Sequence, residues 1–171
     1  MKNQILFKGS PVEIAGKFIE VGTSAPDFSL IKTDLSAQTL HALHGKRVVL
    51  NIFPSVDTDV CALSVRKFNE VAANLPNTVV LCISKDLPFA QGRFCAAEGI
   101  KNVVMLSDFY YQSHFAADYG VLMSSGPLSG LLARSVVIID IDGKVTYAAK
   151  SVDIIQEPDY EQALLALENT K

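Results

Sequence analysis

Strand-length apolar runs alternate with helix-type segments in the middle of the chain, and this alternation constrains the fold most. Arg47–Phe53 and Thr78–Ser84 are nearly continuous in apolar residues, as in strands buried on both faces of a sheet. Between them, the apolar residues of segment 60–72 recur with the period of an amphipathic helix. A second helix-type segment begins near Pro88, with Asp86 as the expected cap, and stops at Gly99. The alternation predicts an α/β sheet with helices packed on its faces.

Shorter segments complete the expected architecture. Residues 1–20 resemble a β-hairpin, and residues 22–30 read as extended chain. Val103–Leu106 is a third short strand, and residues 114–119 form a short helix. Asp142-Gly143 lies between two apolar runs and is a strong signal for a further hairpin, after which Pro158 and Asp159 begin a last helix. The prediction is a mixed central sheet with helices on both faces and an N-terminal hairpin extension.

Length and composition bound the classes of protein. The chain has 171 residues, of which 49% are hydrophobic and 19% charged, so we expect one domain over residues 1–171. A net charge of −3 favours neither nucleic acid nor an anionic membrane surface as a partner. The uncharged stretches are too short to span a membrane, and Lys8 interrupts the N-terminus before any signal-peptide core. We therefore expect a cytoplasmic protein with no membrane contact.

Three cysteines, Cys61, Cys82 and Cys95, are the main chemical candidates. They form no C-x-x-C pair and no zinc-type spacing, and none of the histidines His41, His44 and His114 adds a ligand-like spacing. We therefore expect no metal and no cofactor. An odd number of cysteines argues against a static disulfide framework, although one transient pair with one inert thiol is compatible with it.

Cys61 lies just beyond the end of the Arg47–Phe53 strand, in the first turn of the following helix. Free N–H groups and the positive end of the helix dipole favour an anion there, and the thiolate is the reactive form of cysteine. In open α/β sheets the functional site lies at the carboxyl ends of the strands. A buried, inert cysteine is the alternative at this position.

The pattern Pro54-x-x-x-Thr58-x-x-Cys61 resembles the active-site motif of the peroxiredoxins, which are thiol peroxidases with a thioredoxin-like fold. Other stretches resemble the bacterial thiol peroxidase subfamily, the atypical two-cysteine peroxiredoxins. They include Leu50–Ser55, Ser64–Asn69, Asp86–Gln91, Arg93–Cys95, Gly126–Leu128, Leu131–Arg134 and Glu157–Glu161. The resemblance covers nearly the whole chain, and it implies a thioredoxin-like α/β fold and peroxidase activity.

The resemblance assigns roles to four residues around the peroxide. Cys61 is the peroxidatic cysteine, whose thiolate attacks a peroxide oxygen and becomes a sulfenic acid. Thr58 donates to the thiolate or positions the peroxide, although an ordinary helix cap is the alternative. Arg134 faces the thiolate and offsets negative charge in the transition state. Pro54, which has no N–H, shields the thiolate from water.

Cys95 matches the resolving cysteine of the family, and the resemblance implies an intramolecular Cys61–Cys95 disulfide. Taken alone, a helical cysteine with apolar neighbours is more often part of a core. The C-terminal tail carries no cysteine, which leaves intramolecular resolution or an outside thiol. Cys82 lies among apolar strand residues and is expected to be inert. Asp57 and Asp59 would disfavour a thiolate nearby, so we expect them to point outward or cap the helix.

The leading hypothesis is a thioredoxin-dependent reductase of hydrogen peroxide and of alkyl or lipid hydroperoxides. Apolar residues in the 126–132 loop favour organic substrates by analogy, and the resemblance implies a homodimer. A peroxide sensor that passes oxidation to a client protein is the alternative. The absence of C-x-x-C disfavours a thioredoxin-type disulfide oxidoreductase, and the four matched site residues disfavour a binding module without catalysis.

Overall fold

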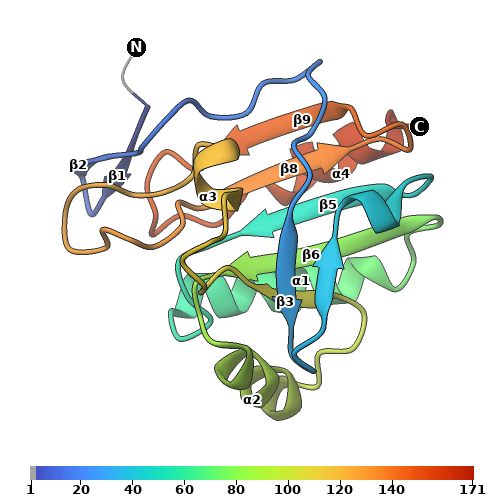
Figure 1. Cartoon of the computed structure of the whole chain (residues 1–171), viewed down its shortest axis with the longest axis horizontal. Helices are drawn as coiled ribbons and strands as arrows, with labels where there is room; N and C mark the ends of the chain where they lie inside the picture. The colour runs from blue at the N-terminus through green and yellow to red at the C-terminus, as the bar shows by residue number, and fades with distance from the viewer. Residues whose placement is uncertain (1–2) are drawn as a thin grey trace.

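The computed structural model describes residues 3–171 as a seven-stranded mixed sheet with a separate two-stranded hairpin (Figure 1). The sheet has the strand order β4-β3-β7-β6-β5-β8-β9, and the hairpin is formed by β1 and β2. The strands are β1 (Gln4–Phe7), β2 (Ser10–Glu13), β3 (Ser29–Lys32), β4 (Ala37–Thr39), β5 (Arg47–Ile52), β6 (Thr78–Ser84), β7 (Val104–Ser107), β8 (Ser135–Ile139) and β9 (Val145–Lys150). The helices are the 3₁₀ turn η1 (His41–Leu43) and the α-helices α1 (Asp59–Ala72), α2 (Pro88–Glu98), α3 (Phe115–Asp118) and α4 (Tyr160–Glu168).

The three central strands are parallel. β5 pairs with β6 from Arg47↔Thr78 to Ile52↔Ile83, and β6 pairs with β7, while α1 and α2 form the crossovers between them. β8 runs antiparallel to β5, and β3 runs antiparallel to β7. The mixed sheet predicted from the sequence is confirmed. Because β5, β6 and β7 are parallel, the segments that follow them emerge at the same edge of the sheet.

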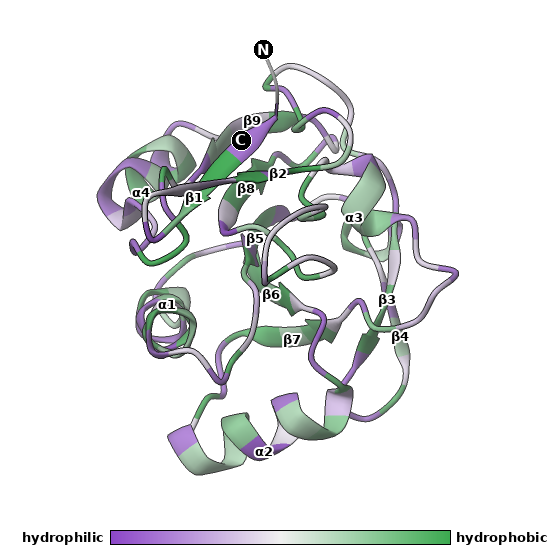
Figure 2. Cartoon of the chain, turned by 90° about the vertical axis from the view of Figure 1, so that its left-hand side faces the viewer, coloured by the Kyte–Doolittle hydropathy of each residue, from purple (hydrophilic) through white to green (hydrophobic). Residues whose placement is uncertain are grey.

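Helices cover both faces of the sheet, as predicted (Figure 2). On one face, α1 and α4 pack against the sheet; this cluster includes Val49, Cys61, Val65, Phe68, Val80, Val136, Ile138, Ala163 and Leu167. On the other face, α3 and the segment before β5 pack against the sheet; this cluster includes Phe28, Leu30, Leu50, Ile52, Leu81, Phe115 and Tyr119. The side chain of Cys61, which belongs to α1, therefore lies in the core between this helix and the sheet.

Within the expected residues 1–20, the N-terminal hairpin is confirmed from Gln4 to Glu13, with β1 paired antiparallel to β2, while residues 1 and 2 lie outside the described part of the chain. Its turn residues Lys8 and Gly9 have φ angles of 51° and 81°, as a two-residue turn of the mirror-image type requires. The hairpin covers a third cluster, which contains Ile5, Val12, Ile14, Met123, Ala133 and Ile154.

Three details differ from the sequence prediction. The antiparallel pair β3–β4 was not predicted, because the alternation in these short strands is weak and only the extended chain before β3 was recognised. The third parallel strand begins at Val104, one residue later than expected. Asp86 does not cap α2: the N-cap is Leu87, which makes no side-chain capping bond, while the Asp86 carboxylate bonds to the loop before α1.

Candidate active site

The first turn of α1 holds Cys61 close to the carboxyl end of β5. Thr58 is the N-cap, with extended backbone angles (φ −100°, ψ 143°), and its Oγ1 accepts a hydrogen bond from the Cys61 N–H at 3.4 Å. The backbone N–H groups of this turn and the helix dipole favour a negative charge on the side chain of Cys61.

Arg134 meets the sulfur of Cys61 inside the protein. Its Nη2 lies 3.1 Å from Cys61 Sγ, and the two residues are 1% and 0% exposed. Strand register explains the contact, since Ser135 pairs with Ile52 at the end of β5 and Arg134 directly precedes it. The contact places a permanently charged donor group directly beside the sulfur.

The rest of the guanidinium is fixed by the backbone. Arg134 Nε donates to the carbonyl of Ile154 at 2.9 Å, which orients the side chain. Nη1 is buried and has no hydrogen-bond partner among the described residues. The guanidinium of Arg134 therefore has one nitrogen, Nη1, without a hydrogen-bond partner among the described residues, beside the Nη2 that contacts Cys61.

The remaining motif residues lie in the loop between β5 and α1. Pro54 is buried, whereas Thr58, Asp57 and Asp59 are exposed, so both carboxylates point outward as expected. The Thr58 hydroxyl donates to the carbonyl of Ser55 at 3.2 Å. In this conformation Thr58 therefore joins the loop to the backbone of Cys61, and its proton is directed at Ser55 and not at the sulfur.

All three cysteines are free thiols, and two of them are poor thiolates. Cys82 is fully buried in β6, and burial raises its pKa to about 12. Cys95 lies in α2, half-buried against the core cluster that contains Cys61 and Cys82, and burial raises its pKa as well. The core position expected for Cys82 is confirmed.

Two polar contacts near Cys61 were not predicted from the sequence. Asn51, fully buried in β5, donates to Ser64 Oγ at 3.2 Å, and Ser64 donates to the Cys61 carbonyl at 2.8 Å. An asparagine inside an otherwise apolar strand was the available signal. Tyr160, at the start of α4, is close enough that the charges of Arg134 and Cys61 affect it, although burial is the main cause of its raised pKa.

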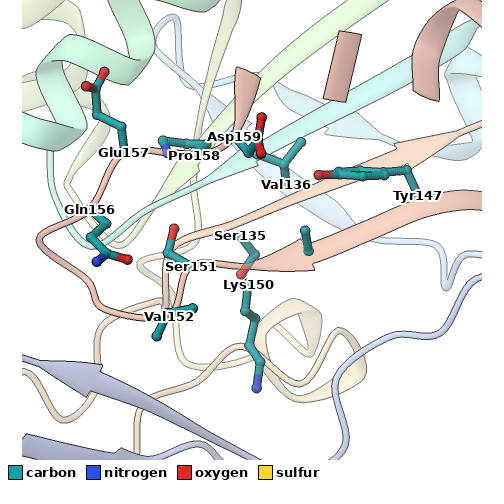
Figure 3. Close-up of a pocket in the computed structure, with 11 residues that line it drawn as sticks. Ser135, Val136, Tyr147, Lys150, Ser151, Val152, Gln156, Glu157, Pro158 and Asp159 are labelled. Atoms are coloured by element: carbon teal, nitrogen blue, oxygen red, sulfur yellow. The ribbon is translucent and has the colours of Figure 1, made fainter. Parts of the chain in front are cut away.

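A cavity of about 290 Å³ lies between β8, β9 and the loop that leads into α4 (Figure 3). Its lining includes Ser135 and Asp159, which are the chain neighbours of Arg134 and Tyr160, but neither Cys61 nor Arg134 lines it. In Figure 3, Lys150 points away from Glu157 and Asp159. The sulfur of Cys61 is therefore closed off from this cavity in the present conformation.

Within residues 3–171, no helix has the length and apolar character of a membrane span. The same part of the chain contains no group of three or more His, Cys, Asp or Glu residues placed to hold a metal ion. His41, His44 and His114 are all exposed.

Known proteins are similar to this chain over nearly its whole length. Residues 20–164 match the Redoxin family. A thiol peroxidase of Corynebacterium glutamicum is 53% identical over 161 residues, which are 94% of this chain and 96% of that protein. A thiol peroxidase of Streptococcus gordonii is 50% identical over 163 residues, which are 95% of this chain and 98% of that protein.

Solved structures show the same fold. The crystal structure of a peroxiredoxin-like protein from Aquifex aeolicus has a TM-score of 0.93 and 38% identity, covering 99% of this chain and 98% of that one. A thiol peroxidase from Chromobacterium violaceum has a TM-score of 0.89 with 22% identity over 99% of this chain and 98% of that one. The fold is that of thioredoxin-like peroxiredoxins, and the chain belongs to the bacterial thiol peroxidases, which are peroxidases of the peroxiredoxin type.

Proposed function

We propose that the protein reduces hydrogen peroxide and organic hydroperoxides with Cys61 as the peroxidatic thiol and Cys95 as the resolving thiol. The observation that carries this proposal is the 3.1 Å contact between Arg134 Nη2 and Cys61 Sγ, in a buried site at the start of α1. A permanent cation at this place supports a reactive thiolate, whereas Cys82 and Cys95 have raised pKa values.

In the first step the Cys61 thiolate attacks one peroxide oxygen. An S–O bond forms, the O–O bond breaks, and the departing oxygen leaves as water or an alcohol after it takes up a proton. The unpaired Arg134 Nη1 is available to donate to a peroxide oxygen while Nη2 remains on the sulfur. A preorganised charged donor of this kind stabilises the charge that develops as the O–O bond breaks.

Thr58 and Pro54 support this step in different ways. Thr58 holds the N–H of Cys61 and so fixes the first turn of α1. Pro54 is buried beside the loop and offers no N–H that could compete for the sulfur or the peroxide.

In the second step Cys95 attacks the sulfur of the Cys61 sulfenic acid. An S–S bond forms, and the sulfenic oxygen leaves as water. Cys61 has no exposed surface here, so we propose that the first turn of α1 and part of α2 open to bring the two sulfur atoms together. Thioredoxin then reduces the disulfide by thiol–disulfide exchange, and its own dithiol is oxidised to a disulfide.

Substrate range and assembly are part of the same proposal. Leu128 and Leu131, which suggested organic substrates, pack against the cluster beneath the N-terminal hairpin, so their apolar character has a structural reason as well. We propose alkyl hydroperoxides as substrates because of the family resemblance. For the same reason we propose a homodimer in which each chain forms one domain.

A coupled assay with thioredoxin, thioredoxin reductase and NADPH tests the proposal against hydrogen peroxide and cumene hydroperoxide. We expect NADPH consumption with the wild-type protein and with Cys82→Ser, but none with Cys61→Ser. Full activity of Cys61→Ser would refute the mechanism. Oxidation of Cys61 without turnover by thioredoxin would favour transfer of oxidation to a client protein.

A further inference from the structure

The carboxylate of Asp86 bonds to the loop that precedes Cys61. Its Oδ1 accepts from Ser55 Oγ at 2.7 Å, and its Oδ2 accepts from the Val56 N–H at 2.9 Å. Asp86 itself follows β6, two residues before α2 begins. A side chain from the segment that leads into the Cys95 helix therefore holds the backbone of the loop before Cys61.

From Ser55 the contacts continue to Cys61. The Ser55 hydroxyl accepts from the Asp57 N–H at 3.1 Å, and the Ser55 carbonyl accepts from the Thr58 N–H and the Thr58 hydroxyl, each at 3.2 Å. Thr58 Oγ1 in turn accepts from the Cys61 N–H. Only two residues, Ser55 and Thr58, lie between the Asp86 carboxylate and the backbone of the peroxidatic cysteine.

In the other direction the contacts reach α2. Asp86 Oδ2 also accepts from Ser84 Oγ at 2.6 Å. That hydroxyl oxygen accepts from Gln91 Nε2 at 3.1 Å, and Gln91 is a fully buried α2 residue one turn before Cys95. Gln91 Nε2 also donates to the Leu106 carbonyl at 2.8 Å, which ties α2 to β7. One carboxylate thus links the segments of both reacting cysteines.

We propose that Asp86 is a positioning residue that holds the Cys61 loop and the Cys95 helix closed, and so sets how readily the disulfide forms. This inference rests on the proposed function, because it assumes that both segments open for the two cysteines to meet. Asp86 touches neither Cys61 nor Arg134 in the contacts described above. It acts through Ser55 and Ser84, whose bonds to a charged acceptor are stronger than bonds between neutral groups.

Asp86→Asn is the informative change because it keeps the shape and removes the charge. In asparagine the oxygen can keep the bonds from the Val56 N–H and Ser84 Oγ while the NH₂ donates to Ser55 Oγ, so the contacts remain but their partner is no longer charged. A hydrogen bond to a charged acceptor is roughly twice as strong as one between neutral groups, so loss of the charge should change the equilibrium by about tenfold. The open form of the reduced protein should therefore become about tenfold more populated while the closed form still predominates.

Three measurements should then move together. Amide hydrogen exchange of residues 55–61 should become about tenfold faster in the reduced protein, and disulfide formation after one equivalent of peroxide should accelerate by a similar factor. The midpoint potential of the disulfide should become about 30 mV more negative, because a tenfold change in a two-electron couple corresponds to that shift.

Asp140→Asn is the matched control. Asp140 also accepts two backbone N–H groups, from Asp142 and Lys144, but it lies in the β8–β9 turn at the other end of the sheet. Its replacement should leave the potential and the exchange of residues 55–61 unchanged. Ser55→Ala, which removes one of the Asp86 bonds, should shift both quantities in the same direction by less.

The outcomes separate this inference from the proposed function. Unchanged exchange and potential in Asp86→Asn, or equal acceleration of exchange in the β6 strand, would overturn the role of Asp86. Exchange in the reduced protein needs no disulfide, so it tests the closed loop even if Cys95 is not the resolving thiol. Failure of the proposed function would appear instead as normal peroxide reduction in Cys61→Ser.

Discussion

Replacement of Arg134 tests the central electrostatic argument. In Arg134→Met the side chain keeps much of its length but loses the charge that lies 3.1 Å from Cys61 Sγ. At an effective dielectric constant of about 20, two unit charges at this distance attract by roughly 5 kcal/mol. The cost of burying the guanidinium offsets part of this attraction, so the net effect is smaller.

Catalytic data on preorganised donors set the expected size of the effect. Loss of one such donor typically lowers a rate by about 10²–10³. We therefore expect the second-order rate of peroxide attack on Cys61 to fall by about that factor. The attack rate of Arg134→Lys should lie between the rates of the wild type and of Arg134→Met. An ammonium keeps the charge, but it cannot contact both the Ile154 carbonyl and the sulfur as a guanidinium does.

Stopped-flow oxidation of the reduced protein measures the attack rate directly. Arg47→Met is a suitable control, because the Arg47 guanidinium also binds backbone carbonyls, those of Leu167 and Pro76, but lies at the C-terminal end of α4. It should lower the free energy of unfolding without slowing peroxide attack. An unchanged attack rate in Arg134→Met would refute the role assigned to this residue.

Three further predictions concern the cysteines and the opening of the site. Cys95→Ser should permit a single oxidation of Cys61 but abolish turnover with thioredoxin, as measured by peroxide consumed per protein and by NADPH oxidation; sustained turnover would show that Cys95 is not the resolving thiol. The raised pKa of Cys82 should make the folded protein lose stability as the pH rises from about 9 to about 12, because the unfolded thiol ionises first and so stabilises the unfolded state. Chemical unfolding of wild type and Cys82→Ala across this range should show a shallower slope for the variant, and equal slopes would contradict the assignment. On oxidation to the disulfide, hydrogen exchange should accelerate in the first turn of α1 and in residues 88–98 but not in β6; equal protection in both redox forms would mean that no opening is needed.

Local sequence signals were sufficient for most of the architecture. The apolar runs of β5 and β6, the helix period of α1 and the Asp142-Gly143 turn each depend on neighbouring residues only. The β3–β4 pair was missed because these strands are short, and because β3 is stabilised by pairing with β7, which is distant in the chain. Asp86 was expected to cap α2 but instead bonds to the Ser55 loop. A residue just before a helix looks the same in the sequence whether it caps that helix or contacts a distant loop.

The sequence by itself determined that this chain forms an alternating α/β sheet and that Cys61 begins a helix after a buried strand. Both features follow from periodicity and from capping, which act over a few residues. The family resemblance implied that Arg134 faces Cys61, but the tertiary structure is what brings the guanidinium to the sulfur, and it alone decided that Asp86 holds the loop before Cys61. These contacts join residues 73 and 30 positions apart in the chain, and they exist because β5 pairs with β8 on one side and with β6 on the other.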